Sequence, residues 1–183
     1  APPPLDRFIN SAAERALPAS ARAWGVEVHY PRYPWLPRIG PRWNPALIAP
    51  AVLPLARRLH AARPFDVVDA QFFYPDGPAA ARVAAALGLP LSIKARGSDI
   101  NLWGEVAFAR KQMLAAADLA AGMLAVSEAL KLEMIALGMA AERITVHYTG
   151  LDHTRFRPLP RAQARAASAA RRTARTWLRR ASC

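Results

Sequence analysis

Four polar or flexible residues, Arg96, Gly97, Ser98 and Asp99, interrupt an apolar stretch, IKARGSDI, at residues 93–100. An arginine in such a place can stabilise negative charge, and an aspartate three residues later can orient it. A glycine between them permits a sharp turn and a close approach of the backbone to a ligand. A structural interpretation stays open as well, because Asp99 can cap the following segment and pair with Arg96 on the surface.

Two further loops carry residues of the same kinds. QFFYPDG, residues 71–77, contains Gln71 and Tyr74, and Ser127 follows another apolar run. A serine at a helix N-terminus can approach a phosphate, but an ordinary N-cap looks the same. Tyr74, beside Pro75, can touch a ligand or simply pack in the turn. Together with the first loop, these residues predict a rim of polar side chains.

The elements that must position these loops alternate between strands and helices. Short β-branched runs predict the strands, and longer alanine- and leucine-rich runs predict the helices. Such alternation is typical of βαβ units with parallel strands, whose ligands bind at the carboxyl ends of the strands. We therefore expect an α/β fold with a Rossmann-like parallel sheet and flanking helices. The expected strands are residues 25–30, 65–70, 89–95, 122–126 and 143–148, and the expected helices are residues 5–24, 46–62, 78–88, 105–120 and 127–138.

Prolines shape the region before the main sheet. Five of them lie in residues 31–45, which we expect to form an extended surface loop because proline lacks the backbone donor of regular structure. In the helix that follows, residues 46–62, Pro50 and Pro54 predict a late start or a break. Arg57, Arg58 and Arg63 would give its end a basic face, which is an ordinary solvated surface or a contact with anionic lipid.

Composition narrows the class of protein. The single cysteine, Cys183, excludes an internal disulfide and fits a cytoplasmic protein. No stretch of about 18 residues is apolar throughout, so a membrane-spanning helix is not expected. His147 and His153 have no cysteine or carboxylate set at metal-ligand spacing, so we predict no metal site.

The net charge of +12 is concentrated at the C-terminus, where seven arginines and no acid lie in residues 161–183. The Arg- and Ala-rich tail, residues 159–183, differs in composition from everything before it. We interpret it as a wrong-frame or disordered segment. Two alternatives are a tail that binds nucleic acid and one that binds anionic surfaces, in which case the chain is a non-enzymatic α/β module.

The series FDVVDAQFFYPDGPAAARVAAALGLPLSIKARGSDINLWG and AADLAAGMLAVSEALKLEMIALGMAAERITVHYTGLDHTRFRP resembles the N-terminal domain of family 4 glycosyltransferases. No single motif in these segments is decisive, but the order and spacing of the motifs together are decisive. The resemblance covers about residues 5–158. It implies one half of a two-domain GT-B architecture, with residues 1–158 as the acceptor-side domain and its first strand missing.

The resemblance also implies an activity and a site. Such enzymes transfer a sugar from a nucleotide-sugar donor to an acceptor with retention of configuration, without a metal or other cofactor. Arg96 and Asp99 match the motif positions expected to be catalytic, with Arg96 acting on a diphosphate leaving group. Arginine stands there in place of the frequent histidine, and Gln71 also replaces a histidine, so neither side chain would transfer a proton. The expected acceptor- or phosphate-binding residues are Gln71, Tyr74, Gly97, Ser98 and Ser127.

The resemblance sets limits as well. The nucleotide is held mainly by a C-terminal domain, so we expect this fragment to be inactive alone. The expected partners are a nucleotide sugar and a glycan, lipid-linked or small-molecule acceptor. Nucleic acid is not an expected partner, and a peripheral contact with the inner face of the membrane is allowed. A nucleotide-sugar epimerase of the same architecture is a further alternative. The identities of donor and acceptor do not follow from the sequence.

Overall fold

The computed structural model describes residues 18–34, 40–154 and 156–161. The chain divides into two compact units, Ala1–Tyr148 and Thr149–Cys183. The sheet, its helices and the candidate site all belong to the first unit. The Arg-rich tail from residue 162 onward and the start of the expected first helix lie outside the described residues. The predicted domain limit at residue 158 stays a prediction.

A parallel sheet of four strands forms the centre of the first unit. Its order is β3 (Val68–Ala70), β4 (Leu91–Ala95), β5 (Gly122–Ala125) and β6 (Ile144–Val146). Each strand is thus the neighbour of the next in sequence, as expected for successive βαβ units. The intervening helices are α3 (Asp76–Leu87), α4 (Ser98–Asn101), α5 (Ala107–Leu119) and α6 (Glu128–Ala136), and the short 3₁₀ turn η2 (Ala141–Arg143) precedes β6. The predicted Rossmann-like α/β fold is confirmed.

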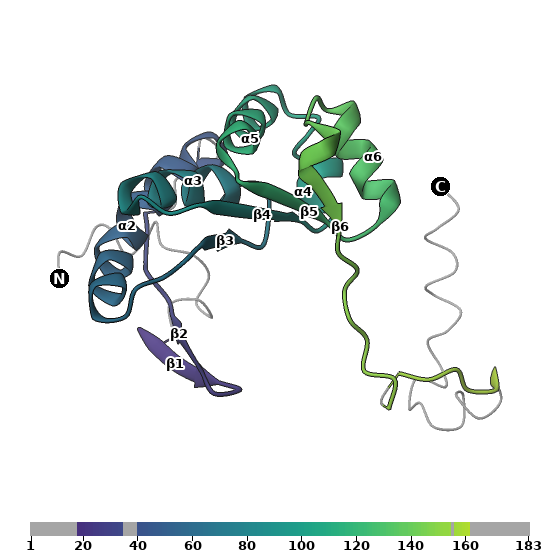
Figure 1. Cartoon of the computed structure of the whole chain (residues 1–183), viewed down its shortest axis with the longest axis horizontal. Coiled ribbons are helices and arrows are strands. Elements are labelled where there is room, and N and C mark those ends of the chain that lie inside the picture. The colour runs from purple at the N-terminus through teal and green to yellow at the C-terminus, as the bar shows by residue number, and fades with distance from the viewer. Residues whose placement is uncertain (1–17, 35–39, 155, 162–183) are drawn as a thin grey trace. The chain divides into compact units, whose positions relative to one another are not determined.

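The crossover helices cover one face of the sheet (Figure 1). On this face the strands present Ile93, Met123 and Ile144, all at most 3% exposed. They form one core with Met113 of α5 and Met134 of α6. Burial of these apolar side chains supplies most of the stability of the sheet, at roughly 1.5–3 kcal/mol for each large side chain.

Side chains of the opposite face come from the alternate positions of the strands. Register pairs Asp69 with Ser92, and Lys94 with Leu124 and then Thr145. Because paired residues of parallel strands point the same way, these five share one face. Four of the five are polar, so this face differs in chemistry from the helix-covered face.

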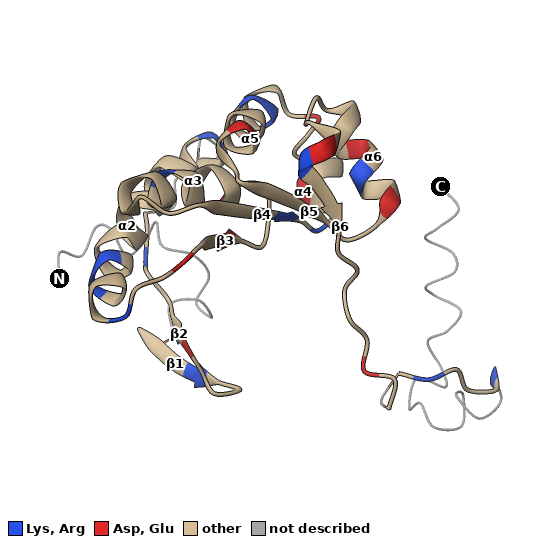
Figure 2. Cartoon of the chain, in the orientation of Figure 1, with Lys and Arg blue, Asp and Glu red and all other residues tan. Residues whose placement is uncertain are grey.

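The helix α2 (Gly40–Ala62) runs without a break through Pro45, Pro50 and Pro54. The expected late start or break is therefore wrong. Each proline removes one backbone hydrogen bond, but Ile48 and Val52 of α2 pack with Val83 of α3, which compensates for that loss. Exposed Arg57, Arg58 and Arg63 lie at its C-terminal end, where Figure 2 shows basic residues.

A two-stranded hairpin replaces the end of the helix expected for residues 5–24. β1 (Ser20–Ala23) pairs antiparallel with β2 (Val26–His29). The turn between them has two residues with positive φ, Trp24 at 49° and Gly25 at 80°, as a tight hairpin turn requires. The expected strand at residues 25–30 exists, but it belongs to this hairpin and not to the parallel sheet. Local hairpin geometry outweighed the helix-forming composition here.

No helix in the described part of the chain is both long enough and apolar enough to cross a membrane.

Candidate functional site

The loops that follow β3 and β4 lie together at the carboxyl edge of the sheet. Strand β4 ends at Ala95, and α4 begins at Ser98. Gly97 between them has a φ of 128°, a conformation that side chains other than glycine rarely adopt. Residues 71–75 form the neighbouring loop, which leads into α3. Both loops thus reach helix N-termini at one edge, as the sequence predicted.

Asp99 joins these two loops. Its side chain is 0% exposed, and its carboxylate accepts hydrogen bonds from the backbone N–H groups of Phe73 at 2.7 Å, Gly97 at 2.7 Å and Arg96 at 3.0 Å. Hydrogen bonds to a charged acceptor are stronger than neutral ones, and three of them offset the cost of burying the carboxylate. Asp99 therefore fixes the position of one loop against the other from inside the protein.

The guanidinium of Arg96 is exposed and points to Gln71, not to Asp99. Its Nη1 donates to Gln71 Oε1 at 3.2 Å, and the amide nitrogen of Gln71 donates to the carboxylate of Asp69. The amide group of a glutamine can accept and donate at once. Gln71 thus links Asp69 to Arg96. Asp99 accepts from the backbone N–H of Arg96 and does not form the surface ion pair of the structural interpretation.

Tyr74 lies in the core behind the rim. It is 0% exposed, its hydroxyl donates to the carbonyl of Pro41, and its ring centroid is 5.0 Å from that of Trp103. Burial raises the pKa of its phenol to about 12, although a hydrogen bond with Gln112 opposes the shift. These contacts agree with the packing interpretation of Tyr74.

The two serines differ in their surroundings. Ser98 is exposed at the start of α4. Ser127 is half-buried, and its Oγ accepts from the N–H of Leu130 at 3.2 Å, so it acts as the N-cap of α6. The structure therefore brings Gln71, Arg96, Gly97, Ser98 and Asp99 together, and it places Ser127 at the end of a different strand.

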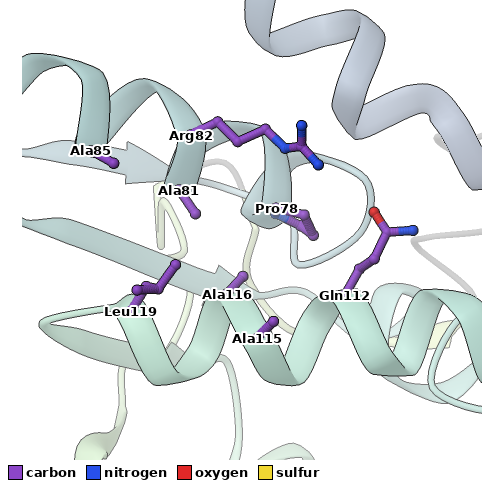
Figure 3. A pocket seen from close by; sticks show the side chains of 8 residues that line it. All are labelled: Pro78, Ala81, Arg82, Ala85, Gln112, Ala115, Ala116 and Leu119. Atoms are coloured by element: carbon purple, nitrogen blue, oxygen red, sulfur yellow. The ribbon is translucent and has the colours of Figure 1, made fainter.

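An apolar cavity of about 300 Å³ lies beside β3, and Gln71 of the rim is part of its lining. Its walls come from α2, β3 and α3, and its polar lining consists of Asp69, Gln71 and Asp76. Burial, and secondarily the charge of Asp99, raises the pKa of the Asp76 carboxyl. A second groove of about 290 Å³ runs between α3 and α5, with Arg82 and Gln112 among mainly alanine side chains (Figure 3). That groove has none of the rim residues.

Sequence reasoning missed a buried lysine at this edge. Lys94 of β4 is 6% exposed, and its Nζ lies 2.7 Å from Nδ1 of His147, which is exposed just after β6. The signal was present, because a lysine stands inside the apolar strand LPLSIKA. In the described residues, no three His, Cys, Asp or Glu side chains are grouped as metal ligands would be.

Comparison with solved structures finds a protein of the same fold. The structure of Anabaena Alr3699/HepE in complex with UDP and glucose matches with a TM-score of 0.51 and 20% sequence identity, over 72% of this chain and 34% of that one. The complex of the same protein with UDP-glucose matches with a TM-score of 0.50 and 19% identity, over 61% and 31%. At this identity the likeness shows the fold alone.

The chain thus spans about a third of the length of the solved structures that it matches. A search among curated proteins finds no match. The sequence profile of Glycosyltransferase Family 4 matches residues 8–155, a range that contains the sheet, its helices and the whole rim. The chain belongs to glycosyltransferase family 4.

Proposed function

We propose that the chain is the acceptor-side, N-terminal domain of a retaining glycosyltransferase with GT-B architecture. The observation that carries this proposal is the rim itself. Asp99 holds two loops together from the core, and one of them presents the exposed guanidinium of Arg96 at the carboxyl edge of the sheet. In open α/β sheets this edge is where ligands bind.

In the proposed reaction, the bond between the anomeric carbon and the diphosphate oxygen of the donor breaks. A bond from that carbon to the acceptor oxygen forms, and the acceptor hydroxyl loses its proton to the departing nucleoside diphosphate. Arg96 is the catalytic residue, because a fixed cation stabilises the charge that develops on the diphosphate. Gly97 and Ser98 lie beside it for backbone and hydroxyl contacts with ligand oxygens.

Asp99 has a different part in this proposal from the catalytic one that its sequence position suggested. Because its carboxylate is buried and holds three backbone N–H groups, it acts as a positioning residue. Gln71 orients the guanidinium of Arg96 through one hydrogen bond. Tyr74 supports the loop from the core, and Ser127 contacts ligand phosphate only if α6 meets the donor.

The proposed partners are a nucleotide-sugar donor and, for a lipid-linked acceptor, anionic lipid. The match covers about a third of the length of HepE, and HepE is crystallised with UDP-glucose. UDP-glucose is therefore the first donor to test. A second domain would bind the nucleotide, and the 183 residues alone would transfer no sugar. The exposed arginines at the end of α2 would bind anionic lipid if the acceptor is lipid-linked.

The test is sugar transfer by the complete protein that contains this chain. UDP-glucose and a panel of glycan, lipid-linked and small hydroxylated acceptors are supplied, and the product is analysed by NMR for the configuration at the new glycosidic bond. We expect a product with the anomeric configuration of the donor. Transfer with inversion, or an absence of transfer and hydrolysis with every nucleotide sugar tried, would overturn the proposal.

A further inference from the structure

Lys94 carries a charge in an unusual place. Lys94 is only 6% exposed, yet its hydrogen-bond partner is the imidazole of His147. No ion pair with Lys94 is found among the described residues. Buried charges in proteins are normally paired with an opposite charge, because a neutral partner offsets little of the lost hydration. An anionic ligand would therefore be a better partner for the ammonium of Lys94 than an imidazole is.

The register of the sheet places His147 at the same edge as Lys94. Ala95 pairs with Ala125, and Ala125 with Val146, so the next row along the strands contains Arg96 and His147. The N–H of His147 donates to the carbonyl of Ala125 at 2.8 Å, which shows that this row is still held to the sheet. Residues two apart on a strand share a face. Lys94 and His147 therefore lie on the polar face, at its carboxyl edge. The guanidinium of Arg96, which follows the last residue of β4, is bonded to Gln71 after β3, whereas the ammonium of Lys94 is bonded to His147 after β6.

The nearby carboxylates do not neutralise this group. Asp99 is engaged by backbone N–H groups in the core, and Asp69 accepts from the amide of Gln71. Asp76, whose carboxyl has a raised pKa, lies in the lining of the apolar cavity beside β3. Figure 2 shows basic residues at the carboxyl end of β4.

We propose that Lys94 and His147 form a binding site for a phosphate or diphosphate group at the carboxyl edge of β4 and β6. The ammonium of Lys94 donates to Nδ1 of His147 without ligand, and a phosphate oxygen replaces that nitrogen as its acceptor when the anion binds. Since His147 is exposed, its ring is free to turn by side-chain rotation, which is fast for exposed residues. The ring then donates its own N–H to a second oxygen.

This inference rests on the proposed function only for the origin of the anion. The diphosphate of a sugar donor and the phosphate of a lipid-linked acceptor have the same oxyanion chemistry, so binding alone does not separate them. The experiment therefore first uses inorganic pyrophosphate as the probe, with the 183-residue chain, and then compares UDP with a polyprenyl phosphate in detergent at equal concentrations.

The measurement is a titration of the isotope-labelled chain followed by side-chain NMR of the Lys94 ammonium, the His147 ring nitrogens and the Arg96 guanidinium. We expect pyrophosphate to shift the Lys94 and His147 signals with one dissociation constant, and the Arg96 signals serve as an independent readout. Lys94→Met should weaken binding by about 10-fold or more, which corresponds to the loss of one charged hydrogen bond. Lys111→Met removes an exposed lysine of α5 and should leave the affinity unchanged.

Folding of the variants is checked by urea unfolding. Methionine has about the shape of the lysine stem, so Lys94→Met should stay folded. His147→Gln, on the surface, provides a second variant that cannot disturb the core and should weaken binding by several-fold.

The outcomes separate the two proposals. If the Arg96 signals shift but those of Lys94 and His147 do not, the Lys94 site is wrong and the proposed function stands. If Lys94→Met and Lys111→Met weaken binding equally, binding is only general attraction to a basic chain and the site is again wrong. Preference for UDP over polyprenyl phosphate assigns the site to the donor, and the reverse preference assigns it to the acceptor.

Discussion

The two faces of the parallel sheet are built for different purposes. The face under α3, α5 and α6 presents Ile93, Met123 and Ile144, which are almost fully buried. The opposite face presents Asp69, Ser92, Lys94, Leu124 and Thr145, and only Lys94 among them is buried. Stability therefore comes mainly from one face, and charged groups that can bind a ligand are confined to the other.

The comparison is sharpest within β4, where the faces alternate. Ile93 and Lys94 are adjacent and both buried, but one lies in the core and the other contacts a histidine. Ile93→Ala should lower the free energy of unfolding by about 4 kcal/mol, because it leaves a cavity in a packed core. Lys94→Met should change it by less than about 1 kcal/mol, because an apolar group there removes a costly buried charge.

Urea unfolding of the 183-residue chain measures both variants. Equal losses of stability in the two variants would contradict the claim that one face stabilises the fold and the other carries the ligand-binding groups.

Asp99 lies where the core meets the rim, so its loss should affect both. Asp99→Ala leaves three backbone N–H groups without their acceptor and should cost about 3 kcal/mol of unfolding free energy. Amide hydrogen exchange should become faster at Phe73, Arg96 and Gly97. Asp118→Ala, at an exposed site of α5, is the matched control. Unchanged exchange at Phe73 in the Asp99 variant would refute the link between the loops.

The helix-covered side should not tolerate added volume. A methyl group on Gly104 would lie 2.3 Å from the carbonyl oxygen of Ile100 and 2.7 Å from Cδ1 of Leu137. Gly104→Ala should therefore cost about 2–3 kcal/mol in the same unfolding measurement. Gly122→Ala is the control, because a methyl group there meets nothing within 4 Å, and it should cost little. A larger loss for Gly122→Ala would show that the packing is wrongly assigned.

Tyr74 gives the core a dependence on alkaline pH. Its phenol has a pKa near 12 in the folded chain, above its ordinary value of 10.0. The unfolded chain therefore loses this proton first, so the stability that neutral Tyr74 contributes is present below pH 10 and is lost as the pH rises toward 12. Two pKa units correspond to about 3 kcal/mol.

The difference in unfolding free energy between the wild type and Tyr74→Phe, measured between pH 9 and about 11.5, should fall by most of that amount. Tyr148→Phe replaces a tyrosine that is 66% exposed and is the control. A difference that stays constant with pH would show that Tyr74 is not held in a buried, neutral state.

Much of this fold could be predicted from sequence, because each parallel strand is bounded by glycine, proline or polar turns. The strands and the three long helices predicted after residue 65 agree with the structure apart from a few residues at the ends, whereas the short helix α4 and the turn η2 were not predicted. The region before it was harder. The β1–β2 hairpin depends on the positive φ of Trp24, and the continuity of α2 through three prolines depends on packing against α3. Neither is visible as a local pattern.

The location of the rim could be predicted from sequence, but the hydrogen bonds between its residues could not. Strand ends locate Gln71, Arg96 and Asp99, and the family resemblance adds the role of a phosphate ligand. The direction of each side chain depends on atoms that are distant in sequence, such as the N–H of Phe73, 26 residues before Asp99. Lys94, by contrast, could have been found from the sequence, since a single charge in an apolar strand is a signal of a functional residue.

The central claim is that the polar edge, and Arg96 above all, carries the chemistry. The most direct measurement is kcat for sugar transfer by the complete protein with Arg96→Ala, beside Arg82→Ala as an exposed arginine of α3. We predict a loss of about 100-fold or more for Arg96→Ala, with unfolding free energy within about 0.5 kcal/mol of the wild type, and no loss for Arg82→Ala. An unchanged kcat in the Arg96 variant would contradict the account.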